Sequence, residues 1–320
     1  MKKAVSILLA VIVTALTFCS CGTETNNTTS GINIVCTAFP QYDFVKNIIG
    51  TEEGLTLLLD DGADLHSYEP TAQDIILIGS ADIFIYGGGA SDDWVEGVLE
   101  SANNPDITTI ATMDLVDTLK EEYLVGMQQD KHEHEHSGIH KGDHIGEDEH
   151  IWLSLKNAVT ITEKLCETIC NVYPENAEEY LINSKNYISD LSALDSEYSA
   201  QIESSARKTL LFADRFPFRY LSADYGITCF AAFAGCSSES EASFETMAFL
   251  IDKTKELALP VILTIDGSDG SLAKTVSDTT GASIRSLDSC QSVSSADISR
   301  GTSYIGIMKS NLEILREALN

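Results

Sequence analysis

Short apolar runs alternate with longer amphipathic segments over much of the chain. In the first half, the short runs are apolar throughout, which predicts buried strands of a parallel sheet. The segments between them predict helices, one of which ends at a glycine. The expected strands are residues 32–37, 55–59, 83–86 and 108–110, and the expected helices are residues 43–50, 71–79 and 94–99.

The same alternation returns in the last third of the chain. Strands are expected at residues 209–213, 227–233, 261–265 and 283–287, and helices at residues 218–224, 244–257, 272–280 and 304–319. Apolar strands that alternate with helices indicate parallel sheets covered on both faces. We therefore predict an α/β protein with two lobes, each built on a mainly parallel sheet.

A different pattern separates the two α/β segments. Apolar side chains recur at spacings of three, four or seven between residues 176 and 205, with neither glycine nor proline. This spacing predicts one amphipathic helix of about seven or eight turns. A coiled-coil dimerisation helix is the alternative, but the segment is short and stands alone. We expect a rigid connector, with a ligand cleft between the lobes at the carboxyl ends of their strands.

The N-terminal residues predict export. A short basic start precedes an apolar stretch from Ala4 to Phe18, which is shorter than the roughly 20 residues that span a membrane. The residues that follow resemble the cleavage box of bacterial lipoproteins, and Cys21 after the small Ser20 is the expected lipidation site, with Cys19 as the alternative. An uncleaved membrane anchor is the other interpretation.

These features divide the chain into five parts. We expect lipid anchoring at the outer face of the bacterial cytoplasmic membrane. The parts are a signal peptide at residues 1–21, a polar tether at 22–30, an N-terminal lobe at 31–175, a connecting helix at 176–205 and a C-terminal lobe at 206–320.

Charge and cysteine usage narrow the possible functions. The formal net charge of −29 argues against nucleic-acid binding, which needs a basic face, and suits a surface that attracts cations. Cys166 and Cys170 lie one helical turn apart in an apolar pattern and are expected in the core. A disulfide among Cys229, Cys236 and Cys290 is possible in an exported protein, but the spacing does not give the pairing.

The most distinctive chemistry lies between residues 132 and 150, which hold six of the seven histidines among many carboxylates. Imidazole nitrogens and carboxylate oxygens are ligands of divalent transition metals, zinc above all. The stretch has too few apolar side chains to form a core. The alternative is a solvated acidic loop. We expect residues 130–149 to form an auxiliary metal-binding loop, with ligands His132, His134, His136, His140 and His144.

Two histidines stand where ordered structure is expected. His66 follows a predicted strand in DLHSYEPTAQD, and His150 lies in DEHIWLSL, where the acidic loop ends. These motifs resemble the first and second metal-ligand motifs of the zinc and manganese solute-binding lipoproteins of ABC transporters, and the resemblance covers nearly the whole mature chain. It implies that His66 and His150 bind a metal between two lobes joined by a rigid helix. An acidic, His-rich insertion before the second ligand is associated with the zinc-specific members.

The second lobe departs from this family pattern. Alignment on Tyr220 and Tyr225 places Arg215 where the family has its third histidine. A guanidinium has no free lone pair and cannot bind a metal. Asp214 is the expected substitute, and the alternative is an ion pair between Asp214 and Arg215 within the lobe.

The fourth ligand implied by the resemblance is an Asp or Glu after a strand. Asp266 occupies that place, and Glu239 and Glu241 are weaker candidates. Two imidazoles with one or two carboxylates suit zinc, and Mn²⁺ is the alternative.

The resemblance implies a monomeric binding protein that delivers Zn²⁺ to an ABC permease and its ATPase. A storage or adhesin lipoprotein would have the same motifs. A metal-dependent hydrolase is disfavoured, because His132, His134 and His136 lie in low-complexity sequence and no HExxH helix is present. We therefore do not expect an enzyme.

Overall fold

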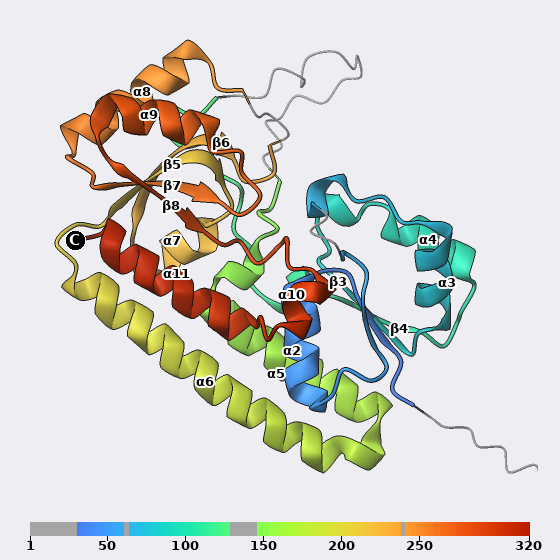
Figure 1. Ribbon diagram of the computed structural model, residues 1–320. Helices are drawn as coiled ribbons and strands as arrows, with labels where there is room; N and C mark the ends of the chain where they lie inside the picture. The colour runs from blue at the N-terminus through green and yellow to red at the C-terminus, as the bar shows by residue number, and fades with distance from the viewer. Residues whose placement is uncertain (1–30, 61–63, 129–145, 238–240) are drawn as a thin grey trace, which may run out of the picture. The chain divides into compact units, whose positions relative to one another are not determined.

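The computed structural model describes residues 31–60, 64–128, 146–237 and 241–320 (Figure 1). All elements below belong to one unit, Asn33–Asn320. Within the described residues, no helix has the length and apolar character needed to cross a membrane. The predicted signal peptide, Cys21 and the five histidines from His132 to His144 lie outside the described residues.

The N-terminal lobe is built on a four-stranded parallel sheet in the order β2-β1-β3-β4. The core beneath α3 and α4 contains Val35, Ile78 and Phe84, which are fully buried. The strands are β1 (Ile34–Cys36), β2 (Leu55–Leu57), β3 (Ile83–Tyr86) and β4 (Thr108–Ala111), and the helices are α2 (Phe39–Ile49), α3 (Ala72–Ser80) and α4 (Val95–Ala102).

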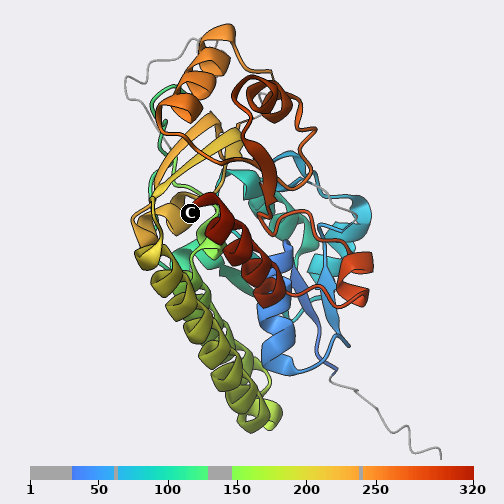
Figure 2. The ribbon, with the colours of Figure 1, turned by 60° about the vertical axis from the view of Figure 1, so that its left-hand side comes forward.

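The C-terminal lobe repeats this architecture with the strand order β6-β5-β7-β8, again parallel throughout. Helices α8 and α9 pack on one face of the sheet and α11 lies on the other (Figures 1 and 2). The strands are β5 (Thr209–Phe216), β6 (Thr228–Ala234), β7 (Val261–Ile265) and β8 (Ser283–Leu287), and the helices are α7 (Arg219–Tyr225), α8 (Phe244–Glu256), α9 (Ser271–Thr280), α10 (Ser295–Ser299) and α11 (Tyr304–Ala318).

Two long helices, α5 (Leu155–Val172) and α6 (Ala177–Ser204), pack against each other between the two α/β segments of the chain. Helix α6 also contacts α2 of the first lobe and α11 of the second (Figure 1). The Tyr198 hydroxyl donates a hydrogen bond of 2.6 Å to the Met308 carbonyl in α11. The helix expected over residues 176–205 is therefore present, and it contacts both lobes.

The predicted fold class is confirmed: two parallel-sheet α/β lobes accompany one long helix. Helix α2 begins four residues earlier than expected, at Phe39, with Pro40 at its start, where the missing N–H of proline has no partner to lose. All six cysteines of the described chain are free, so the structure shows no disulfide among Cys229, Cys236 and Cys290.

Candidate metal centre

His66 is positioned by two short turns of the N-terminal lobe. It lies in the 3₁₀ turn Leu65–Ser67, whose N-cap residue, Asp64, accepts a hydrogen bond of 2.9 Å from the His66 N–H. The ring nitrogen Nδ1 lies 2.8 Å from the Ser91 hydroxyl, which belongs to the turn Ala90–Asp92 after β3. Fixing Nδ1 in this way leaves Nε2 directed at the cleft.

His150 is fully buried immediately before the turn Ile151–Leu153. One carboxylate oxygen of Asp148 lies 2.9 Å from the His150 backbone nitrogen and 3.0 Å from its ring Nδ1. A carboxylate acceptor holds the proton on Nδ1 and leaves a lone pair on Nε2. The C-terminal lobe secures this segment, because the Tyr220 hydroxyl donates to the Asp148 carbonyl at 2.8 Å.

The two imidazoles converge although the histidines are 84 positions apart in sequence. Their Nε2 atoms lie 3.3 Å apart. Two nitrogens bound to one tetrahedral zinc at about 2.0–2.1 Å lie about 3.3–3.4 Å apart, so this spacing fits a shared metal. The Cys236 sulfur is the third donor, and all three ligand atoms lie within 4.8 Å of one another. Among the described residues, this is the one group of three or more such donors.

Cys236 enters the site from the carboxyl end of β6. Gly235 precedes it and packs so closely against His150 that an added Cβ would lie 3.0 Å from the imidazole Cε1. Cys236 was not predicted as a ligand, because the sequence alone placed it among potential disulfide partners. The available signal was its position directly after a predicted apolar strand, where ligands of α/β proteins gather.

Burial controls the charge of the donors. Burial above all, together with the neighbouring His150, lowers the pKa of His66 to about 4, although Asp64 opposes the shift. Burial raises the pKa of the Cys236 thiol, and so do the carboxylates of Glu121 and Glu149. Before metal binds, the His66 imidazole is therefore neutral and the Cys236 thiol carries its proton at neutral pH.

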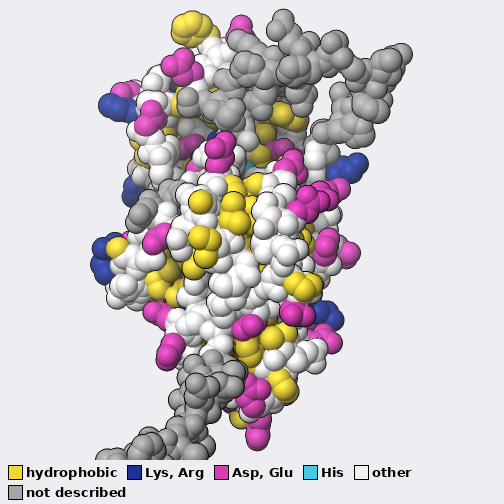
Figure 3. All heavy atoms as spheres, turned by 90° about the vertical axis from the view of Figure 1, so that its right-hand side faces the viewer, with side chains coloured by type: hydrophobic (Ala, Val, Ile, Leu, Met, Phe, Trp, Pro, Cys, Tyr) yellow, Lys and Arg dark blue, Asp and Glu magenta, His cyan; other side chains and the backbone are white. Residues whose placement is uncertain are grey.

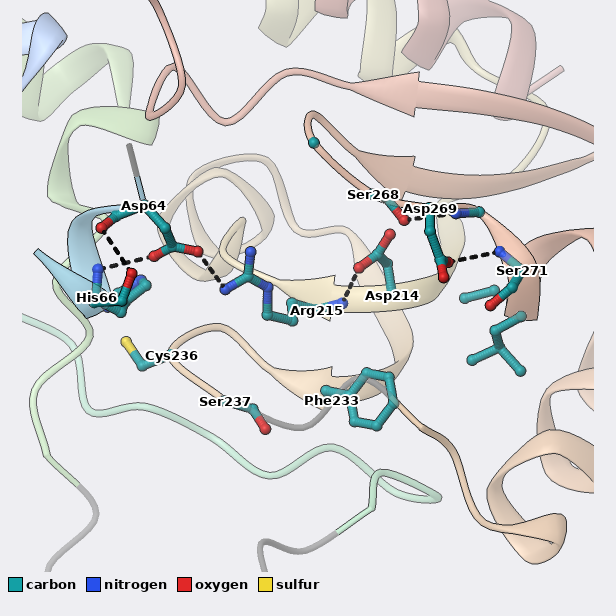
Figure 4. Close-up of a pocket in the computed structure, with 15 residues that line it drawn as sticks. Asp64, His66, Asp214, Arg215, Phe233, Cys236, Ser237, Ser268, Asp269 and Ser271 are labelled. Carbon is teal, nitrogen blue, oxygen red and sulfur yellow. Dashed lines mark hydrogen bonds and ion pairs between the residues drawn. The ribbon is translucent and has the colours of Figure 1, made fainter. Parts of the chain in front are cut away.

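Arg215 and Asp214 point to different partners (Figure 4). The Arg215 guanidinium pairs with Asp64 of the N-terminal lobe, with Nη1 3.1 Å from the carboxylate. The Asp214 carboxylate accepts the backbone N–H groups of Arg215 at 2.8 Å and Ile265 at 3.3 Å. The alternative of an Asp214–Arg215 side-chain ion pair within the lobe is therefore wrong, since Arg215 pairs across the cleft.

The carboxylates predicted as ligands are not brought into the three-donor group. Asp214 lines the same cavity as His66 but is held by backbone amides. The Asp266 carboxylate accepts the Ser289 N–H at 2.6 Å and is absent from the cavity wall. Glu241 is exposed and Glu239 lies outside the described residues. The ligand roles of Asp214 and Asp266 stay predictions.

A cavity of about 500 Å³ opens beside the donors. Both lobes line it: Asp64 and His66 from the first, and Arg215, Cys236 and the loop 267–272 from the second. Acidic side chains are spread over the face of the molecule shown in Figure 3, in keeping with the net charge of −29. Such a surface raises the local concentration of cations.

Comparison with known proteins identifies the family of this chain. Residues 34–318 match the model of the family described as zinc-uptake complex component A, periplasmic (ZnuA). The chain belongs to this family. The high-affinity zinc uptake system protein ZnuA of Bacillus subtilis is 29% identical over 327 residues, which cover 100% of this chain and 99% of the relative.

Two streptococcal proteins extend the comparison. The zinc-binding lipoprotein AdcA of Streptococcus pneumoniae serotype 4 is 29% identical over 316 residues, or 98% of this chain, which spans only 61% of AdcA. The Zn(II)-bound crystal structure of the ZnuA-like domain of S. pneumoniae AdcA superposes with a TM-score of 0.72 at 27% identity, covering 90% of this chain and 98% of that domain.

Proposed function

We propose that this protein is an exported, lipid-anchored solute-binding protein that captures Zn²⁺ and delivers it to an ABC permease. The observation that carries the proposal is the convergence of three donors from both lobes. His66 and His150 place their Nε2 atoms 3.3 Å apart, and the Cys236 sulfur lies within 4.8 Å of them. Family membership and the zinc-binding names of the relatives support the same function.

The donor set favours zinc over manganese. A thiolate and two imidazoles are ligands that zinc accepts readily, whereas manganese prefers oxygen. The chain's own residues prepare the site: Asp148 fixes the His150 ring, and Ser91 fixes the His66 ring. When zinc binds, it takes the place of the proton on the Cys236 thiol. Capture of the ion in this way requires no catalytic step.

The remaining parts of the proposal concern the segments outside the described residues. We propose that Cys21 carries the lipid anchor on the outer face of the cytoplasmic membrane. We propose that His132, His134, His136, His140 and His144 collect zinc at low affinity, because clustered imidazoles are ligands of this metal. Delivery to a permease and its ATPase is inferred from the family.

A competitive zinc titration tests the function. The mature protein lacking residues 130–147 is compared with the same protein carrying His66→Ala, and with the matched control Glu69→Ala, whose side chain is exposed nearby. One tight site that survives Glu69→Ala and is lost in His66→Ala would support cleft capture. The absence of a tight site from the parent protein would reject it.

A further inference from the structure

The described residues supply fewer donors than tetrahedral zinc uses. Zinc takes four ligands, and the described residues bring three donor atoms together. Each of the carboxylates around the group already accepts a hydrogen bond from a backbone N–H. These pairs are Asp64 with His66, Asp148 with His150, Glu149 with Ser91 and Glu121 with Cys236.

The cavity beside the donors exceeds what a metal ion needs. Its volume of about 500 Å³ is in the range of small-molecule sites, whereas one water molecule occupies about 30 Å³. His66 and Cys236 lie toward one end of the residues drawn in Figure 4, and Ser268 and Ser271 lie toward the other. A ligand bound to the metal can therefore extend into this space.

Arg215 gives this cavity a preference for a carboxylate. Its guanidinium lines the wall and donates through Nη1 to Asp64, and neither Nε nor Nη2 has a hydrogen-bond partner among the described residues. A cation here repels a bare metal ion, but its planar fork matches a carboxylate. A carboxylate placed between zinc and Arg215 can bind the metal and also accept hydrogen bonds from the guanidinium.

The far side of the cavity limits the charge of such a ligand. Asp214 and Asp269 lie there, and both carboxylates already accept backbone N–H groups. A ligand with several carboxylates would meet repulsion from them. A small ligand with one carboxylate and one ammonium group, such as an α-amino acid, fits the cavity and its charges, because the ammonium group is attracted to Asp214 and Asp269.

We propose that the cleft binds zinc together with a small amino-carboxylate, whose carboxylate completes the metal coordination and pairs with Arg215. This inference rests on the proposed zinc-binding function. In this proposal Arg215, which stands where the family has its third histidine, recognises a ligand bound to the metal instead of binding the metal itself.

Equilibrium dialysis with zinc and radiolabelled glycine tests this inference. Zinc content is measured separately, and labelled 2-aminoethanol, which lacks the carboxylate, is the matched ligand control. We expect one glycine to be retained per cleft zinc in protein lacking residues 130–147, with none retained without zinc. Retention of 2-aminoethanol should be far weaker.

Substitution of Arg215 supplies the second arm. Arg215→Gln should weaken glycine retention about tenfold, the loss expected for a hydrogen bond to a charged group, while zinc stays bound. Arg215→Lys should fall between the two, because it keeps the charge without the fork. Arg219→Gln is the matched control, since Arg219 has similar exposure (27% against 25%) and pairs with Glu122 away from the cavity wall.

The outcomes separate the two proposals. Zinc bound without glycine, or glycine retained equally by wild-type protein and Arg215→Gln, overturns the amino-carboxylate site and leaves zinc capture intact. Absence of cleft zinc under all conditions overturns the proposed function itself. Thermal melting of each variant verifies that it is folded.

Discussion

Asp148 determines which nitrogen of His150 is available to a metal. Its side chain is 2% exposed, and one oxygen contacts both the backbone nitrogen and the ring Nδ1 of His150. An amide at this position keeps an acceptor but removes the charge that holds the proton on Nδ1. Partners of this kind tune metal affinity even though they do not touch the metal.

We therefore expect Asp148→Asn to weaken zinc binding about 10- to 100-fold, the range typical of outer-shell carboxylates. Competitive titration with a chromogenic chelator measures the change. Glu147→Gln is the matched control, because it removes the same charge from an exposed neighbour. Equal affinity in the two variants would show that the Asp148 contact does not prepare the site.

Cys236 makes zinc binding depend on pH. Burial raises the pKa of this thiol, so a proton must leave when the metal binds. The pKa of His66 is lowered by burial to about 4, so its imidazole is already neutral at higher pH and releases no proton. Affinity must then rise with pH, by about tenfold per unit for one proton.

We expect zinc affinity to rise with this slope between about pH 7 and about pH 8.5 in protein lacking residues 130–147. This range lies above the usual titration range of histidine. Cys236→Ser should remove the slope and weaken binding, whereas the buried Cys229→Ser should preserve both. Calorimetry in buffers of different ionisation enthalpy counts the released proton. A slope that persists in Cys236→Ser would assign the proton to another group.

The site residues show what sequence can and cannot predict. The sequence predicts His66 and His150 as ligands because each lies in a local motif, and the structure brings their Nε2 atoms within 3.3 Å. Cys236 was not predicted as a ligand because it lies 86 positions after His150 and approaches the two histidines only in the folded chain. Asp214 was predicted as a ligand because it is the sequence neighbour of Arg215. The direction of its side chain, however, depends on the register shift in the pairing of β5 with β6 between Phe212 and Arg215.

At the scale of elements, the pattern of apolar residues predicted most of the strands and helices. Strands β3, β7 and β8 have the predicted bounds. β3 and β7 are buried and almost wholly apolar, which makes such strands visible in the sequence, whereas β8 is mostly exposed and carries polar side chains. The periodic side chains of α6 are buried as expected, and Leu191 is fully buried. Helix α10 was missed, since a polar five-residue helix leaves no periodic signal.

Helix α6 offers a direct measure of this burial. Leu191→Ala removes a side chain with 0% exposure and should lower the free energy of unfolding by about 2–5 kcal/mol. Leu181→Ala on the same helix removes a side chain that is 58% exposed and should change it by less than about 0.5 kcal/mol. Urea unfolding followed by circular dichroism compares them. Similar losses in both variants would contradict the packing of α6.

At the scale of the whole molecule, one buried carboxylate connects both lobes to the long helix. Asp43 lies in α2 and is 2% exposed. Its Oδ2 accepts a hydrogen bond of 2.9 Å from the Tyr187 hydroxyl in α6, and the carboxylate also accepts the backbone N–H of Tyr304 at the start of α11. Burial nevertheless dominates and raises the pKa of Asp43 to about 6.

This raised pKa predicts how stability depends on pH. The ordinary pKa of Asp is about 3.9, so between about pH 4 and about pH 6 the folded protein holds a proton that the unfolded chain has lost. The contribution of Asp43 is therefore complete below this window and is lost as pH rises through it. Two pKa units correspond to about 3 kcal/mol.

Asp43→Asn tests this contribution, because the amide cannot ionise and can still accept from Tyr187. We expect the metal-free variant to lose less unfolding free energy than wild type between about pH 4 and about pH 7, by an amount approaching 3 kcal/mol. Buried Asp92 and Asp288, whose pKa values burial also raises to about 6, titrate in both proteins and cancel in the comparison. Asp190→Asn, an exposed change on α6, should match wild type. Identical pH profiles for Asp43→Asn and wild type would mean that Asp43 stays ionised through this window, held by its donors from α6 and α11.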